Sequence, residues 1–247
     1  MMHNNPFIGA NALLRGLSLL TRPGLRRFVV VPLLINVLLF AGGLWYATDR
    51  IGTLVAWLQD RLPGWLQWIE WLLWPLFIIS AVLLVFYAFS LAANLIAAPF
   101  NSLLAERVEV YLTGEPTTET GGWRKALAEV IPAFASELRK LLYLALRAVP
   151  LLLLFVIPGV NLVAPFLWLA FSAWMLAVEY ADYPMGNHGL DFRALRRRLG
   201  ERRLMSLGFG GAVLCGTLIP LLNFVVMPAA VAGATLLWVE HYQAPSA

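Results

Sequence analysis

The fold is decided by the stretch Ala148–Val178, which reads AVPLLLLFVIPGVNLVAPFLWLAFSAWMLAV and contains no Asp, Glu, Lys or Arg in 31 residues. Three further runs without a charged residue occupy 28–48, 71–105 and 204–239. A helix needs about 20 consecutive apolar residues to cross the hydrocarbon core of a bilayer. Four such runs predict an all-α integral membrane protein, whose helices cross or enter the bilayer.

The composition of the chain is that of a membrane protein. Hydrophobic residues make up 60% of the 247 residues and charged residues 13%, whereas soluble domains contain about 45–50% and 25%. No Ser/Gly linker or low-complexity tract divides the sequence, so we expect a single membrane domain over 1–247. The run 28–48 is longer than a signal-peptide core of about 7–15 residues. It is therefore expected to be a retained helix rather than a cleaved signal or a twin-arginine export signal.

Two of the runs are expected to be long transmembrane helices, at 28–48 and 71–105. At 1.5 Å per residue the second would extend ~50 Å, more than the ~30 Å core of a bilayer. It must therefore tilt, kink or run past the membrane. Pro75 and Pro99 are the expected kink or boundary points because proline interrupts helices.

Two stretches outside these runs have the character of membrane-surface segments. Pro6–Leu20 carries Arg15 as its only charge, which favours an interfacial helix that lies on the membrane. The stretch 49–70 contains several tryptophans, which prefer the level of the lipid headgroups. Either another surface helix or a plain loop with aromatic anchors fits that stretch.

The other two runs are expected to form Pro-broken helical hairpins, at 141–178 and 204–239. The breaks are Ile157–Asn161 and Ile219–Asn223, followed by a further proline in each run. Proline and glycine punctuate helices, so each run reads as two arms joined by a turn. The chain would then consist of two long helices and two hairpins, with interfacial and cytoplasmic helices between them.

The two hairpins form an internal repeat. Their breaks share the pattern Ile-Pro-x-x-Asn at a separation of 62 residues, and each run ends in a Val-Glu pair, at a separation of 61. Each arm has about 14–17 apolar residues, or roughly 21–25 Å of helix, which is short for a full crossing. The hairpins either cross the bilayer with short arms or enter it partway and return, and we favour partial entry.

The asparagines at the breaks are candidate pore or hairpin-tip residues. They are Asn161 and Asn223, together with Asn94 in a weaker third copy of the pattern. Polar or broken backbone at membrane depth is tolerated only against protein or water. We therefore expect these tips to meet each other, another subunit or a wet cavity. Ordinary loops that reach the far surface are the alternative.

The basic residues set the orientation of the chain. Sixteen of the 18 Lys and Arg residues lie before residue 28 or in the stretches 106–147 and 179–203. A hairpin returns to its starting side, so all sixteen fall on one face of the membrane. Cytoplasmic loops are enriched in Lys and Arg. We therefore expect cytoplasmic segments at 106–140 and 179–203 and both termini in the cytoplasm.

No set of residues typical of catalysis occurs in the sequence. His3, His188 and His241 lack metal-ligand spacing, and no nucleotide-binding Gly-x4-Gly-Lys-Ser/Thr loop is present. Glu179 and Asp182 lie near a membrane boundary and could relay protons, but such residues more often cap a helix or pair with arginine. We expect no enzyme, no metal and no cofactor. Nucleic acid is not an expected partner, because the basic residues flank apolar runs.

The strongest candidate for binding is the start of the first membrane helix, at Gly24, Arg26 and Arg27. The first N–H groups of a helix lack intrahelical partners, and the helix dipole adds partial positive charge there. Glycine lets an anion approach the backbone, and arginine offers planar donors suited to oxyanions. These features favour a sulfate- or phosphate-sized site. Arginines that only orient the helix are the alternative.

Several stretches of the sequence resemble the CysZ family of bacterial sulfate permeases. The resemblance runs from about Phe7 to Tyr242, with the matching stretches in the expected order. They are Arg22–Phe28, Asn94–Glu106, Phe171–Ala177, Asp182–Pro184 with Asn187 and His188, and Ile219–Asn223.

The resemblance implies an inner-membrane protein that takes sulfate into the cytoplasm for cysteine biosynthesis, by a pore or carrier without its own ATPase. It implies that Gly24, Leu25, Arg26 and Arg27 contact sulfate. It also implies a homo-oligomer with hairpins that only partly penetrate the membrane. The alternative function is a membrane scaffold or assembly protein that transports no solute.

Overall fold

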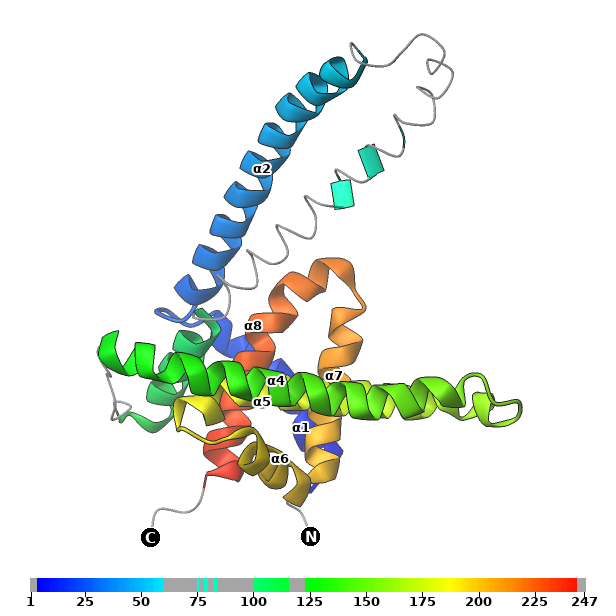
Figure 1. Ribbon diagram of the computed structural model, residues 1–247. Coiled ribbons are helices and arrows are strands. Elements are labelled where there is room, and N and C mark those ends of the chain that lie inside the picture. The colour runs from blue at the N-terminus through cyan, green and yellow to red at the C-terminus, as the bar shows by residue number, and fades with distance from the viewer. Residues whose placement is uncertain are drawn as a thin grey trace. The chain divides into compact units, whose positions relative to one another are not determined.

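The computed structural model describes residues 4–59, 75, 78–79, 82–83, 100–115 and 123–243. Every regular element in these ranges is a helix, and no strand occurs among them (Figure 1). The expectation of an all-α chain is confirmed for this part. The chain forms two compact units, Met1–Val29 with Asn101–Ala247, and Val30–Phe100.

The smaller unit is built on helix α2 (Arg27–Gln59), whose first two thirds contain the expected helix 28–48. The helix continues without a break to Gln59, so the described part of the stretch 49–70 extends α2 and is not a separate surface helix or loop. Leucine, valine and phenylalanine side chains along α2 are exposed, as a lipid-facing helix requires. Most of the second expected helix, 71–105, lies outside the described residues, and its described positions are helical.

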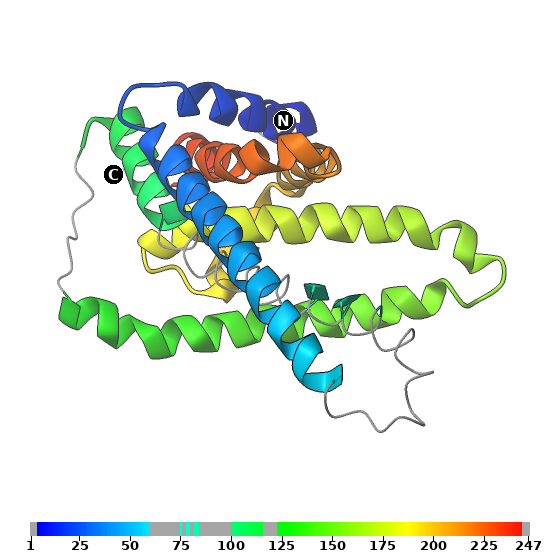
Figure 2. The same cartoon turned by 90° about the horizontal axis from the view of Figure 1, so that it is seen from above.

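Helix α1 (Pro6–Leu20) lies against α7 (Arg203–Thr217) and α8 (Pro220–Leu237) in the larger unit (Figure 2). Glycines make this approach possible on both sides of the contact. A Cβ atom at Gly9 or Gly16 would lie less than 3.0 Å from backbone atoms of α7 or α8. One at Gly233 would lie 2.6 Å from the carbonyl oxygen of Ala12. Small residues let helix backbones pack closely in this way.

The helix expected at Pro6–Leu20 has the bounds of α1. Its position on the membrane surface stays a prediction. One face of α1 is buried against the larger unit, including Ala12, Leu13 and Leu19. Phe7 and Leu14 remain exposed on the opposite face. The helix is therefore a packed part of the unit and keeps only one side for the membrane or a partner.

The run 141–178 contains two helices joined by an irregular segment. Helix α4 (Trp123–Leu154) ends before 155–163, where Gly159 takes a left-handed backbone conformation with φ of 84°. The short 3-10 helix η2 (Val160–Leu162) lies in this segment, and α5 (Ala164–Asn187) follows. Both helices continue well into the stretches 106–140 and 179–203. Their charged turns retain helical periodicity, which an apolar run does not reveal.

In the run 204–239 the helix is interrupted at 218–219, just before Pro220. Pro220 is the first residue of α8, where a proline costs no hydrogen bond because that N–H would be unpaired in any case. Asn223 therefore belongs to the first turn of α8 and not to the break itself. The last turn of α8 passes into a π-helix, η3 (Trp238–Tyr242).

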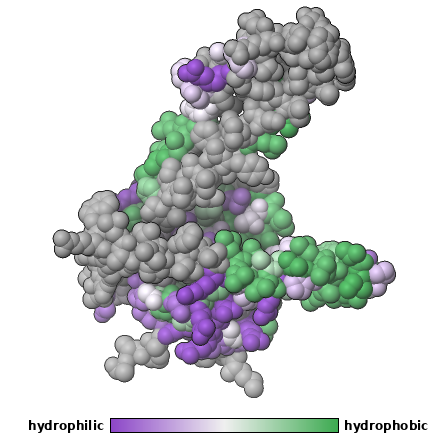
Figure 3. Space-filling view, viewed as in Figure 1, coloured by the Kyte–Doolittle hydropathy of each residue, from purple (hydrophilic) through white to green (hydrophobic). Residues whose placement is uncertain are grey.

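Helix α6 (Phe192–Glu201) connects α5 to α7. The Asp191 side chain caps its N-terminus by accepting a hydrogen bond of 2.8 Å from the Ala194 N–H. Among the described residues, Ala164–Asn187 and Leu222–Tyr242 are long and apolar enough to cross a membrane. Exposed apolar side chains cover the end of the hairpin formed by α4 and α5, and the surface over α6 is hydrophilic (Figure 3).

Candidate functional site

The loop between α1 and α2 forms a tight turn at the predicted anion site. The Leu25 N–H donates a hydrogen bond of 3.2 Å to the Arg22 carbonyl oxygen. Pro23 occupies the second position of this turn and Gly24 the third, with φ of 91°. Proline followed by glycine with positive φ is the pattern of a type II turn. The sequence Arg-Pro-Gly-Leu thus reverses the chain just before the helix begins.

The side chains that follow Gly24 lie in different environments. Leu25 is 4% exposed and belongs to the hydrophobic core of the larger unit, and Phe28 packs against that core. Arg26 and Arg27 are exposed. Leu25 therefore anchors the loop, and any contact of Leu25 with an anion would involve its backbone.

The backbone of this segment is open where an anion would bind. A Cβ atom at Gly24 would meet nothing within 4 Å. The Phe28 N–H donates to Leu25 and the Val29 N–H to Arg26, at 3.0 and 3.1 Å. Among the described residues, no acceptor bonds the N–H groups of Arg26 and Arg27 at the start of α2.

The arginines of the segment are also free of carboxylates within the described part of the chain. The Arg27 guanidinium lies 5.0 Å from the Phe28 ring centre, a cation–π distance. Unpaired N–H groups, the positive end of a helix dipole and two arginines thus lie within four residues. This combination suits a small dianion.

The other predicted residues do not join this segment within one chain. Asn161 lies in η2 and Asn223 in the first turn of α8, and both side chains are exposed. In Figures 1 and 2 the two hairpin tips lie apart from each other and from the loop that follows α1. Asn94 lies outside the described residues.

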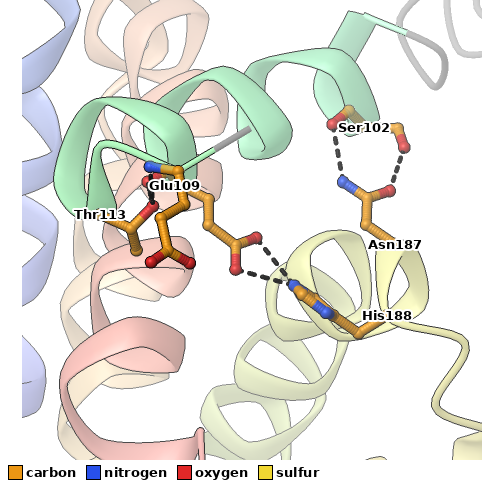
Figure 4. A network of polar contacts seen from close by, with 6 residues as sticks. Ser102, Glu109, Thr113, Asn187 and His188 are labelled. Carbon is orange, nitrogen blue, oxygen red and sulfur yellow. Dashed lines mark hydrogen bonds and ion pairs between the residues drawn. The ribbon is translucent and has the colours of Figure 1, made fainter. Parts of the chain in front are cut away.

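A polar network that the sequence did not predict joins the helical residues 101–113 to the end of α5 (Figure 4). The His188 Nε2 atom lies 2.8 and 2.9 Å from the two carboxylate oxygens of Glu109, which is buried. The Asn187 side chain accepts a hydrogen bond of 2.6 Å from the Ser102 hydroxyl and donates one of 3.0 Å to its carbonyl oxygen. The partners are about 80 positions apart in the sequence, so no local sequence pattern indicates the network.

The two Val-Glu pairs of the internal repeat each supply an ion pair to another helix. Glu240 receives two hydrogen bonds from Arg15, of 2.6 and 2.8 Å, and these raise the pKa of the Arg15 guanidinium. Glu179 lies 3.9 Å from the buried Lys140, which also contacts Asp182 at 2.7 Å. Asp182 thus pairs with a lysine of α4 and not with an arginine. Within the described ranges, no three His, Cys, Asp or Glu residues could hold a metal ion.

Comparison with known proteins places the chain among transporters. The family model described as "Sulfate transporter CysZ/Etoposide-induced protein 2.4" matches residues 12–228, which include the Gly24–Arg27 segment. The chain belongs to this family. It is 44% identical over 241 residues to the sulfate transporter CysZ of Pectobacterium atrosepticum, covering 97% of this chain and 87% of that protein. The proteins of the same name from Pseudomonas aeruginosa PAO1 and Pseudomonas fluorescens are 44% and 45% identical. Each match covers 94% of this chain, and 95% and 93% of the relative.

The family resemblance inferred from short motifs is thereby confirmed. The relatives are transporters by name, which agrees with the expectation that the chain is not an enzyme. The helices Ala164–Asn187 and Leu222–Tyr242 are consistent with a membrane location.

Proposed function

We propose that this chain carries sulfate across the bacterial inner membrane into the cytoplasm, where it supplies cysteine biosynthesis. Membership of a family whose relatives are named sulfate transporters is the observation that carries the proposal. The open turn before α2 supports it, because it combines unpaired N–H groups with arginines. No ATPase activity of the chain itself is needed in this proposal, since flow through a pore or a carrier can follow the gradient.

Sulfate would bind at the segment Gly24–Arg27. A tetrahedral dianion can accept hydrogen bonds from the open N–H groups at the start of α2 while a guanidinium binds two of its oxygens. Leu25 holds the turn to the core, so the donors are fixed before the anion arrives. Pre-positioned donors replace the water around sulfate at a lower entropic cost than mobile side chains would.

The finer arrangement in the membrane forms part of the same proposal. Both termini lie in the cytoplasm, as the distribution of basic residues favours. The two hairpins enter the bilayer partway. The uncharged part of each arm supports this because it is shorter than the about 20 residues of a full crossing, although Ala164–Asn187 and Leu222–Tyr242 as whole helices reach that length. The tips with Asn161 and Asn223 lie apart in a single chain, so a homo-oligomer would be required to bring such tips together around a wet path.

The test is sulfate flux into liposomes that contain only the purified protein. The variants Arg26→Lys and Arg27→Lys keep the charge that orients the helix but lose the forked geometry. Loss of one charge-assisted hydrogen bond costs about 1.5–3 kcal/mol, or roughly tenfold or more in sulfate affinity. Arg107→Lys is the matched control, because Arg107 is an exposed arginine outside the segment.

The outcomes separate the site from the function. Wild-type flux with unchanged affinity in both Lys variants would leave transport intact and reject the site. No sulfate-dependent flux from an intact wild-type preparation would reject transport and favour the scaffold. A variant of Gly24 tests the site independently, because a side chain there should hinder the approach of the anion to the backbone. Gly24→Asn is preferable to a β-branched residue because Asn tolerates positive φ.

A further inference from the structure

Helices α4 and α6 meet at a cluster of two aromatic rings and two arginines. The rings of Tyr143 and Phe192 pack edge to face, with centres 5.6 Å apart. The Arg196 guanidinium carbon lies 4.5 Å from the centre of the Tyr143 ring and 4.8 Å from that of Phe192. The Arg147 guanidinium carbon lies 5.4 Å from the same Tyr143 ring. Two cations from different helices therefore share one aromatic ring.

Neither cation of this cluster is neutralised by a carboxylate in the described part of the chain. The Arg196 Nε atom is buried and has no hydrogen-bond partner there. Asp182 contacts Lys140, and Asp191 caps α6, so both of these carboxylates are engaged elsewhere. Two like charges around one ring are unfavourable unless an anion joins them.

The cluster lies where the polar and apolar surfaces of the unit meet. Arg193 and Arg197 are exposed on α6. Leu146 and Val149, which flank Arg147 on α4, are 64% and 56% exposed. Figure 3 shows hydrophilic surface over α6 and hydrophobic surface along the end of the hairpin formed by α4 and α5. Tyrosine and arginine side chains favour this boundary because their stems or rings contact apolar groups while their polar ends reach the headgroups.

We propose that Tyr143, Arg147 and Arg196 bind the phosphate of an anionic phospholipid. The two guanidinium groups supply paired donors to the phosphate oxygens, and the Tyr143 hydroxyl can supply a third. The exposed Leu146 and Val149 side chains contact the acyl chains of the same lipid. A free sulfate or phosphate ion would leave these apolar side chains uncovered, so the surface favours a lipid. The proposal does not depend on sulfate transport.

The test titrates the purified full-length protein in detergent with phosphatidylglycerol or phosphatidylcholine of the same acyl chains, and counts bound lipids by native mass spectrometry. We expect tighter binding of phosphatidylglycerol by the wild type. Arg147→Gln, at an exposed position that tolerates the change, should weaken that binding about tenfold through loss of a charge-assisted contact. Arg196→Gln should do the same, and Arg107→Gln is the charge-matched control outside the cluster.

Equal affinity for the two lipids would overturn the proposal. Equal weakening in Arg147→Gln and Arg107→Gln would also overturn it, because it would show a general effect of charge. Displacement of phosphatidylglycerol by millimolar inorganic sulfate would reassign the cluster to a free anion. Selective loss in Arg147→Gln, with the wild-type preference kept in Arg107→Gln, would support it.

Discussion

Adjacent glycines in α7 should respond in opposite ways to alanine. A Cβ atom at Gly210 would lie 2.7 Å from the carbonyl carbon of Ala173 and 3.1 Å from the amide nitrogen of Ala177, both in α5. One at Gly211 would meet nothing within 4 Å. The neighbours at Gly210 are backbone atoms, so they cannot rotate away, and α7 would have to move off α5.

The magnitude of the effect follows from comparing the two variants. At either position, replacing a helical glycine by alanine raises the free energy of unfolding by about 0.5–1 kcal/mol, because the unfolded chain with alanine has less conformational entropy. This gain cancels when Gly210→Ala is compared with Gly211→Ala. The remainder is the overpacking cost at Gly210, typically about 1–3 kcal/mol. Gly211→Ala alone should be slightly more stable than the wild type.

The assay is thermal unfolding of the purified protein in detergent, followed by helical circular dichroism. In domains of 150–250 residues, 1 kcal/mol moves Tm by about 2–4 °C. Gly210→Ala should therefore melt about 2–12 °C below Gly211→Ala. Equal Tm values for the two variants would refute the close backbone contact between α5 and α7.

Two further predictions concern buried charge and topology. Lys140→Met should destabilise the fold by about 1–3 kcal/mol in the same melting assay, because the Asp182 carboxylate loses its 2.7 Å partner. Lys140→Arg should recover most of that loss, and unchanged stability in Lys140→Met would show that the pair contributes nothing. Single cysteines from Asn161→Cys and Asn223→Cys, in a Cys215→Ser background, should react slowly with a membrane-impermeant thiol reagent added from the periplasm. Rapid labelling of both would mean that the hairpins cross the membrane.

The helical class could be predicted because apolar runs report burial in lipid directly. The helix ends could not, and α4 shows why. It begins at Trp123, whereas the hairpin was expected from 141, because its polar turns retain helical periodicity although they carry charge. Pro220 was expected within a break, but it starts α8, since proline suits the first turn of a helix as well as the end of one.

The candidate site was predictable only where it is local. The Gly24–Arg27 segment is continuous in sequence, so its turn and its helix start could be inferred from residue types. The contacts of Glu109 with His188 and of Arg15 with Glu240 join distant positions. Nothing near either residue in the sequence identifies its partner, because such pairs depend on how the helices pack.

The order of synthesis determines when α1 can pack against its partner helices. Helix α1 leaves the ribosome before its partners α7 and α8. They, and Glu240, which pairs with Arg15, follow roughly 200 residues later. At about 5–20 residues per second, this delay is on the order of 10–40 s. Nascent chains that stop before residue 203 leave the glycine face of α1 without a partner. That face is then available to lipid or to the insertion machinery until the hairpin of α7 and α8 has been synthesised.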